Sequence, residues 1–431
     1  MISRCVACES IEPEIGIEGE ESSMKTVKMG IIGLGQRGLS MLKSILLKME
    51  DVEIVAVCDE YADRTEQAAD AVEKKTGKRP FASVDYADVL RLNGLDAVYV
   101  ATSWETHVEI GTEAMKNGVA VALEVGGAYS LQSLWSMVHM QEQTGTPLML
   151  MENCCFGKDE LLATSMARRG LFGEIVHCHG AYAHYLAEEV ARGEEIRHYR
   201  LRNYLTRNCE NYPTHELGPI AKLLNINRGN RMLSLVSVAS KAVGMEDYVA
   251  RRAEQFPHLV GKRFRQGDIV NTLITCADGS TVSLRLDTTL PRSYSREFTV
   301  RGTRGMYEQN TNTVFLEGDR ETFDTHRYYR ENFGNAARFE ADYLPPVWRE
   351  MTEETVKAGH GGMDAIEFRV FVDCLKANCP MPIDVYDAAA WMAVTALSEA
   401  SVAAGGLVQA VPDFTGGMWT RRKPLDVVPM E

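Results

Sequence analysis

The sequence contains no long apolar run free of charged residues, so we expect no segment of it to cross a membrane. It also has no excess of basic residues. The 46 lysines and arginines stand against 60 aspartates and glutamates, which gives a formal net charge of -14. Because that average charge repels a phosphate backbone, we expect no nucleic-acid partner.

Regularly spaced cysteines are absent too. The 10 cysteines are scattered over 431 residues, and a chain of this length can be stable without disulfide bridges. We therefore expect mostly reduced thiols and a cytoplasmic protein. Cys5 and Cys8 form a single CxxC pair with no further ligands nearby, so no metal is predicted. Residues 1–24 are acidic and lack the cationic start and apolar core of a signal peptide, which predicts a disordered extension.

Strand-like and helix-like segments alternate from residue 25 onward. A chain of this length exceeds one typical core, so two domains are expected. The first strand-like segments are short, apolar and bounded by turns: 26–33, 52–59, 96–102, 119–124 and 147–152. Strands that alternate with helices predict an α/β domain over 25–150, with the doubly wound parallel sheet of the Rossmann type.

The second half has a different pattern. Its strand-like segments are separated by turn signals such as Ala-Asp-Gly-Ser (277–280): 174–185, 234–242, 269–276, 281–287, 297–301 and 313–317. Segments 363–378 and 384–404 have helical periodicity. We predict an α+β domain over 151–431 with an open, mainly antiparallel sheet that serves as a substrate platform. An open sheet face commonly pairs with another subunit, so we expect a homo-oligomer.

A glycine-rich turn follows the first strand and opens a helix, as dinucleotide binding requires. In Gly33-Leu-Gly35-Gln-Arg-Gly38, the glycines permit a tight turn, close approach of a pyrophosphate and close helix packing. Asp59 ends the second strand, where a carboxylate binds ribose hydroxyls and repels a 2′-phosphate. These features favour NAD over NADP. The alternative is a glycine turn of another α/β fold, with Asp59 as a helix cap.

Further polar residues stand at the expected carboxyl edge of the sheet, where ligands bind in such folds. Gln36 and Arg37 can reach phosphate oxygens, or they are merely exposed. Trp104 can pack on the cofactor or in the core, and His107 can cap a helix. Glu124 ends a strand near the expected nicotinamide, and its alternative is an exposed loop acid.

With these residues the chain resembles the Gfo/Idh/MocA oxidoreductases, which pair a Rossmann domain with an open antiparallel sheet domain. Most of these enzymes carry Glu-Lys-Pro where this chain has Glu124-Val125-Gly126. The lysine assists hydride transfer in that family. Its replacement by Val125 speaks against an ordinary dehydrogenase.

A narrower resemblance is carried by several motifs in order: Met-Glu-Asn-Cys-Cys-Phe-Gly (151–157), Asn-Tyr-Pro-Thr-His (211–215), Leu-Gly-Pro (217–219), Asn-Ile-Asn-Arg-Gly (225–229) and Asp-Thr-Thr-Leu-Pro-Arg-Ser-Tyr-Ser-Arg (287–296). They are similar to glycoside hydrolase family 109, whose members are NAD-dependent α-N-acetylgalactosaminidases. This chain departs from that family at three positions, where the family carries tyrosine for Phe156, glycine for Glu216 and proline for Gly126.

The resemblance implies two sets of site residues. The cofactor set comprises the glycine loop with Gln36 and Arg37, then Asp59, Trp104, His107, Glu124, Val125 and Asn153. The sugar-binding or sugar-processing set comprises Arg200, Tyr212, His215 and Tyr294. Tyr182 ends a predicted strand and is a weaker candidate for the sugar cleft.

The expected chemistry is oxidation of a sugar at C3, elimination of the C1 group, addition of water and re-reduction. His215 suits the base because imidazole titrates near neutral pH, while Tyr212 and Arg200 can donate to oxygen. Alternatively, His215 is a helix cap and Tyr212 a core aromatic. His177 and His179 lack a third ligand, so no metal site is predicted from them either.

Three functions compete at this stage. The leading hypothesis is an NAD-dependent glycosidase acting on a small sugar or glycoside. The alternatives are an NAD-dependent sugar or polyol dehydrogenase, which Val125 disfavours, and a non-catalytic NAD-binding regulatory protein. His215, Arg200 and Tyr294 speak against the regulatory protein, whereas Phe156 speaks for it because a tyrosine there would be a candidate acid/base.

Overall fold

The computed structural model describes residues 26–320, 324, 326, 329–352 and 359–431. The extension predicted over 1–24, with Cys5 and Cys8, lies outside the described residues. Cys58, Cys154, Cys155, Cys178, Cys209 and Cys276 are free thiols. Cys379 is disulfide-bonded, so the expectation of reduced thiols does not hold there. Among the described helices, none has the length and apolar composition that a membrane span requires.

The first sheet is parallel throughout, and its strand order is β3-β2-β1-β4-β5-β6. The strands are β1 (Val27–Ile32), β2 (Val52–Cys58), β3 (Phe81–Ser83), β4 (Ala97–Val100), β5 (Ala120–Glu124) and β6 (Leu148–Met151). The helices that alternate with them are α2 (Gln36–Ser44), η1 (Leu46–Lys48), α3 (Ala62–Thr76), α4 (Tyr86–Leu90), α5 (His107–Lys116) and α6 (Leu131–Thr144). Strands β4 and β5 are buried along their whole length, as strands covered on both faces must be. The predicted Rossmann sheet is confirmed, and the short strand β3 is an addition to it.

The second sheet has eight strands in the order β13-β12-β11-β7-β10-β9-β8-β14. They are β7 (Ile175–Ala183), β8 (Met232–Ala239), β9 (Ile269–Cys276), β10 (Thr281–Asp287), β11 (Thr299–Gly302), β12 (Gly305–Glu308), β13 (Thr313–Leu316) and β14 (Gln409–Ala410). Every neighbouring pair is antiparallel except β7 and β10, which are parallel. In β9, buried and exposed residues alternate, so one face of the sheet packs inward and the other faces solvent. The predicted open, mainly antiparallel sheet is confirmed.

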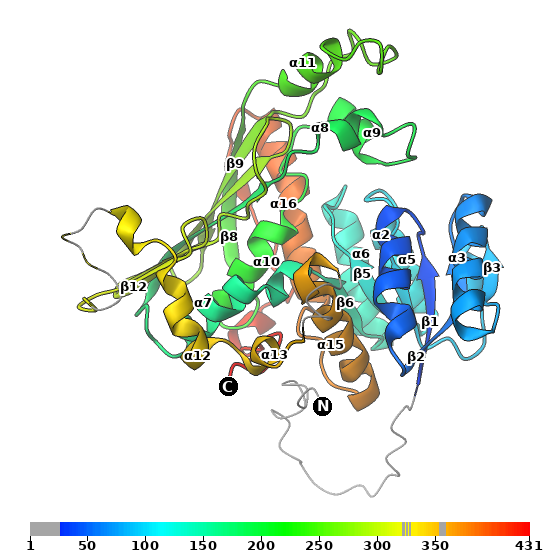
Figure 1. Ribbon diagram of the computed structural model, residues 1–431, viewed down its shortest axis with the longest axis horizontal. Coiled ribbons are helices and arrows are strands. Elements are labelled where there is room, and N and C mark those ends of the chain that lie inside the picture. Colours follow the sequence, from blue (N-terminus) through cyan, green and yellow to red (C-terminus); the bar gives the residue numbers. More distant parts are fainter. Residues whose placement is uncertain (1–25, 321–323, 325, 327–328, 353–358) are drawn as a thin grey trace, which may run out of the picture.

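The remaining helices are η2 (Asn153–Phe156), α7 (Lys158–Arg168), α8 (Ala187–Ala191), α9 (Arg200–Thr206), α10 (Thr214–Leu223), α11 (Gly244–Ala250), η3 (Tyr329–Asn332), η4 (Asn335–Phe339), α12 (Glu340–Tyr343), α13 (Pro346–Arg349), η5 (His360–Gly362), α15 (Met363–Ala377), α16 (Val385–Ala403) and η6 (Met418–Thr420). Two of these helices, α15 and α16, lie between the sheets (Figure 1). Helix α16 contacts β6 of the first sheet and β8 of the second. The C-terminal part of the chain therefore returns to join the two sheets.

Candidate active site

One cavity of about 1430 Å³ brings the predicted cofactor and sugar residues together. Its lining comes from the carboxyl ends of the first sheet's strands and from the second half of the chain. The predicted residues that line it are Gly33, Gly35, Gln36, Arg37, Asp59, Glu124, Val125, Asn153, Tyr182, Arg200, Tyr212, His215 and Tyr294. This location matches the ligand crevice expected of open α/β sheets.

The glycine loop is shaped for close packing and close approach. Gly33 has a φ of +97°, and a Cβ added there would come 2.5 Å from the Ala101 backbone. A Cβ on Gly38 would lie 1.9 Å from the Gly33 carbonyl oxygen, so no side chain fits between β1 and α2. The loop thus presents backbone and the N-terminus of α2 to the cavity, which fits the pyrophosphate of a dinucleotide.

Asp59 stands at the cavity with its carboxylate fixed in place. Its Oδ2 accepts a 2.7 Å hydrogen bond from Leu34 N, and its Oδ1 accepts one of 3.0 Å from Tyr61 N. Arg64 Nη1 is 3.8 Å from Oδ2. Asp59 therefore joins the glycine loop to the end of β2, at the position expected for the ribose hydroxyls of NAD.

Arg37 lines the cavity, but its guanidinium is bound by protein carboxylates. Its Nε donates to Glu124 Oε1 at 2.6 Å, and its two Nη atoms donate to Asp364 at 2.9 and 3.0 Å. The expected phosphate contact is therefore replaced by a bridge between α2, β5 and α15. Glu124 is buried and also accepts from Tyr99 Oη at 2.7 Å, which excludes the alternative of an exposed loop acid.

Trp104 and His107 lie behind the cavity wall and not on it. The Trp104 ring packs 4.7 Å from the Tyr199 ring, so the packing alternative describes it better than a cofactor contact. Thr106 occupies the N-cap position of α5, and His107 is the first residue of the helix. Both His107 ring nitrogens lack a hydrogen-bond partner among the described residues, and burial lowers the pKa of His107 to about 4.

The absence of a side chain at Gly126 leaves room for the Trp104 ring behind the cavity wall. A Cβ on Gly126 would come within 2.3 Å of Trp104 Cδ1 and 2.7 Å of His107 Cε1. A proline, which carries a Cβ, would meet the same atoms. The departure at Gly126 is thus matched to the packing of Trp104 and His107 beneath β5.

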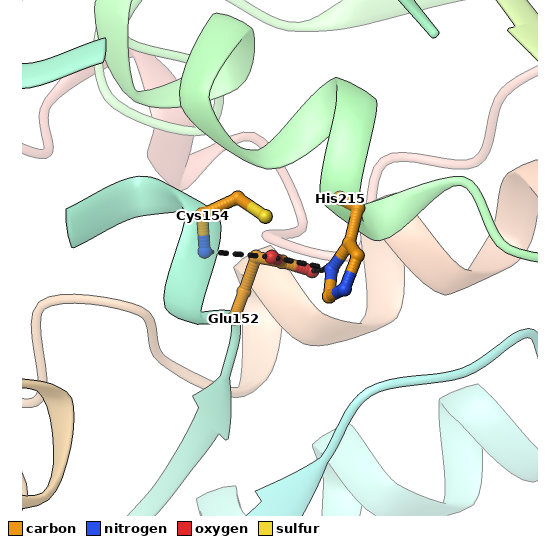
Figure 2. Close-up of side chains that lie close together, drawn as sticks. All are labelled: Glu152, Cys154 and His215. Carbon is orange, nitrogen blue, oxygen red and sulfur yellow. Dashed lines mark hydrogen bonds and ion pairs between the residues drawn. The ribbon is translucent and has the colours of Figure 1, made fainter. Parts of the chain in front are cut away.

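His215 is held by a carboxylate that the sequence interpretation did not single out. It is the second residue of α10, and its Nδ1 lies 2.8 and 3.0 Å from the two oxygens of Glu152 (Figure 2). Glu152 is fully buried directly after β6. Burial alone would raise the pKa of Glu152, but the charge and hydrogen bond of His215 lower it. The pair orients the ring so that Nε2 is the nitrogen available to a ligand.

The predicted sugar residues Tyr182 and Tyr212 line the cavity beside Arg200, and the Arg200 guanidinium also packs on Trp104 behind the wall. The Arg200 guanidinium carbon lies 5.1 Å from the ring centres of both Trp104 and Tyr212, and Arg200 Nε is 2.8 Å from Glu189 Oε1. The Tyr212 ring lies 4.5 Å from that of Tyr182. Tyr212 is a buried core aromatic that also lines the cavity, whereas His215 lines the cavity as the second residue of α10 and is not its cap.

Phe156, His177 and His179 lie outside this site. Phe156 is fully buried and does not line the cavity. His177 Nδ1 is 2.9 Å from Thr281 Oγ1, and His179 Nδ1 is 2.8 Å from Ser283 Oγ, which is a structural arrangement on the open sheet.

One group within the described residues has the spacing of metal ligands, which the sequence did not predict. An oxygen of Glu152, the sulfur of Cys154 and a ring nitrogen of His215 lie within 4.8 Å of one another (Figure 2). Glu152 and the Nδ1 atom of His215 are already hydrogen-bonded to each other. We assign no metal to the group.

The site also contains residues that the sequence interpretation missed. Asn153 Nδ2 donates to Asp364 Oδ1 at 2.7 Å, so the expected cofactor residue is anchored by α15. Glu152 could have been found from its place at the carboxyl end of β6, where functional residues of this fold gather. Asp364 gave no such signal because it stands at the start of a helix far along the chain.

Comparison with known proteins first defines a class. Residues 27–152 match the model of the oxidoreductase family with an NAD-binding Rossmann fold. An inositol dehydrogenase homolog from Azotobacter vinelandii, solved with NAD+, has a TM-score of 0.66 at 17% identity, over 92% of this chain and 100% of that chain. A myo-inositol 2-dehydrogenase from Lactobacillus plantarum has a TM-score of 0.61 at 14% identity, over 90% of this chain and 100% of that chain. The fold is that of the Gfo/Idh/MocA oxidoreductases, and the cofactor is NAD.

The second half of the chain narrows this class. Residues 156–421 match the model of the C-terminal domain of glycosyl hydrolase 109. A glycosyl hydrolase family 109 protein from Stenotrophomonas maltophilia is 37% identical over 425 residues, 93% of this chain and 92% of that protein. An alpha-N-acetylgalactosaminidase from Tannerella forsythia is 35% identical over 421 residues, 92% of this chain and 88% of that protein. The chain belongs to glycosyl hydrolase family 109 and is an NAD-dependent glycosidase, as its motifs predicted.

Proposed function

We propose that the protein cleaves α-N-acetylgalactosaminides, with NAD retained through the catalytic cycle. The observation that carries this proposal is a single cavity lined by both the dinucleotide residues and His215, whose ring is held from behind by Glu152. The substrate class is supported by the 35% identity to the alpha-N-acetylgalactosaminidase of Tannerella forsythia. Val125 in place of a lysine supports a reaction without net oxidation.

In the proposed reaction, His215, Arg200 and Tyr212 have separate roles. The glycine loop and Asp59 would hold NAD, which when bound would supply reversible hydride transfer at sugar C3. With a carbonyl group at C3 the C2 proton becomes acidic, and His215 Nε2 removes it because Nδ1 is held by Glu152. Arg200 and Tyr212 supply cationic and hydroxyl donors to the oxygen that gains negative charge. Elimination at C1 and addition of water complete the cleavage, without the paired carboxylates of ordinary glycosidases.

Tyr294 marks where the aglycone would lie. It is 49% exposed and lines both the main cavity and a smaller adjoining one of about 520 Å³. Polar side chains line the smaller cavity, including those of Arg292, Gln309 and Asn310. We propose that the sugar binds between His215 and Tyr294 and that its C1 substituent extends past Tyr294.

The test is a panel of aryl glycosides incubated with the protein, with and without added NAD+. Aglycone release and NADH absorbance are followed together. We expect release from the α-N-acetylgalactosaminide without accumulation of NADH. If NADH forms in proportion to the sugar consumed, the protein is a dehydrogenase and the proposal fails.

We also propose that the protein is a cytoplasmic homo-oligomer. The buried free thiols support the location. The open sheet face supports the assembly, because Val238 is 60% and Leu273 56% exposed on neighbouring strands. Sedimentation of the purified protein tests the assembly, and a monomer at micromolar concentration would contradict it.

A further inference from the structure

Two buried glutamates flank the segment that carries Tyr212 and His215. Glu210 is fully buried and Glu216 nearly so. Among the described residues, no lysine, arginine or histidine forms an ion pair with either carboxyl group; the charged groups on neighbouring elements pair elsewhere: Arg285 with Glu297, His215 with Glu152, and Arg200 with Glu189. Two unpaired negative charges in such a place are strongly unfavourable.

The hydrogen bonds of the two carboxyl groups leave one oxygen of each without a donor. Glu216 Oε2 accepts from Tyr182 N at 2.8 Å and from Arg285 N at 3.2 Å. Glu210 Oε1 accepts from Tyr212 N at 3.4 Å. Glu216 Oε1 and Glu210 Oε2 are buried and receive no donor from the described residues, and the two carboxyl groups act directly on each other. A bond between two carboxyl groups requires a proton.

We propose that Glu210 and Glu216 share one proton, and that this buried pair is a positioning element for the side chains that process the sugar. The effect of the pair on kcat rests on the proposed function, whereas its effect on the pH dependence of the melting temperature does not.

The pair connects the elements that carry Tyr182 and Tyr212. Through Glu216, helix α10 is tied to the backbone of β7 at Tyr182 and of β10 at Arg285. Through Glu210, the loop before α10 is tied to Tyr212 N. The rings concerned are close, with centroids 4.5 Å apart for Tyr182 and Tyr212 and 4.7 Å apart for Tyr212 and His215. If both carboxyl groups ionise, their repulsion strains the hydrogen bonds that hold Tyr182 and Tyr212 in place.

The pH at which this happens follows from the burial. Burial raises the pKa of Glu216 well above its ordinary value, and it raises that of Glu210 from 4.5 to about 8. Between pH 4.5 and about 8, the folded protein keeps a proton on this pair that the unfolded chain has lost. The contribution of this pair to stability is therefore fully present below about pH 4.5 and is lost as the pH rises through about 8.

Glu216→Gln tests the shared proton. The amide keeps an acceptor for Tyr182 N and Arg285 N and donates to Glu210, as the protonated acid does, but it does not titrate. We expect near wild-type turnover at pH 7 and a melting temperature, measured without NAD, that changes less between pH 5 and 9. Glu216→Ala loses the two acceptor bonds, and we expect it to lower kcat by up to about 10²-fold with NAD affinity unchanged.

Glu367→Gln is the control for buried carboxyl groups in general. Glu367 is fully buried on α15, and its substitution should leave an alkaline fall of the melting temperature in place because Glu210 and Glu216 are unchanged. The proposal is overturned if Glu216→Gln melts with the same pH dependence as the wild type. It is also overturned if Glu216→Ala turns over as fast as Glu216→Gln. A wild type without glycosidase activity would defeat the proposed function, yet the melting experiment would still decide whether the proton is shared.

Discussion

At the scale of single residues, the site depends on which atoms are already engaged by the protein. His215 and Glu152 form a pair in which the carboxylate is fully buried and the ring reaches the cavity. Arg37 is in the glycine loop and lines the cavity, but three of its N–H groups donate to Glu124 and Asp364. Position in the cavity is therefore not enough to assign a role; the free donors and acceptors of each side chain decide it.

The His215–Glu152 pair leads to the first prediction. His215→Ala should retain the fold and NAD binding and lower kcat by about 10²-fold or more, which is the usual effect of losing a general base. Glu152→Gln should also lower kcat, because the carboxylate no longer stabilises a protonated ring. Steady-state kinetics and NAD titration measure both effects. Unchanged turnover in His215→Ala would remove this histidine from the mechanism.

Asp59 leads to the second prediction. Its carboxylate holds the glycine loop through Leu34 N and faces the cavity. Asp59→Ala should weaken NAD binding by about ten-fold, or about 1.4 kcal/mol, and reduce the discrimination against NADP. Calorimetric titration with both dinucleotides measures this. Tighter binding of NADP than of NAD by the wild type would contradict our assignment.

At the scale of elements, the return of the chain through α15 sets the geometry of the cofactor side. The first residues of α15 carry Asp364, which bonds both Arg37 on α2 and Asn153 after β6. Burial alone would raise the pKa of Asp364, but the hydrogen bond from His360 and the charge of Arg37 hold it well below its ordinary value of 3.8. A helix from the end of the chain thus fixes the glycine loop and the β6 edge together.

The third prediction concerns this bridge. Asp364→Asn should destabilise the protein by about 1–3 kcal/mol at pH 7, because Arg37 loses a charged partner. An acid whose pKa is lowered on folding stabilises the folded state above its unfolded pKa. The difference from wild type should therefore shrink as the pH falls below about 4. Urea unfolding at several pH values measures it, and a difference independent of pH would exclude the charged bridge.

At the scale of the whole molecule, catalysis needs both sheets because the cavity takes one wall from each half of the chain. The Rossmann half presents the glycine loop, Asp59 and Glu124, and the other half presents Arg200, Tyr212 and His215. Helices α15 and α16 join the halves (Figure 1). A sugar bound in the cavity would therefore lie between the nicotinamide side and the base.

The fourth prediction follows from this arrangement. If the C3 ketone is only an intermediate, the C2–H bond is broken by His215 and rebuilt from solvent. A reaction in heavy water should give a cleaved sugar with one deuterium at C2, without NADH accumulating in step with product. Mass spectrometry and NMR of the sugar measure this. A product without deuterium at C2 would rule out the elimination route.

The sequence by itself determined the fold class, the family and the cofactor. Strand and helix periods are local patterns, and the Gly33–Gly38 turn needs only its neighbours to take its shape. The family motifs also named His215, Arg200 and Tyr212, because each motif is a continuous stretch of chain.

Only the tertiary structure decided the partners of those residues. Glu152 meets His215 across 63 positions, and Asp364 meets Arg37 across 327. Trp104 turned out to lie behind the cavity because a glycine at 126 leaves room for its ring. The protonated pair of Glu210 and Glu216 has the same origin. Whether a carboxyl group keeps its proton depends on what surrounds it, and burial and long-range contacts exist only once the chain has folded.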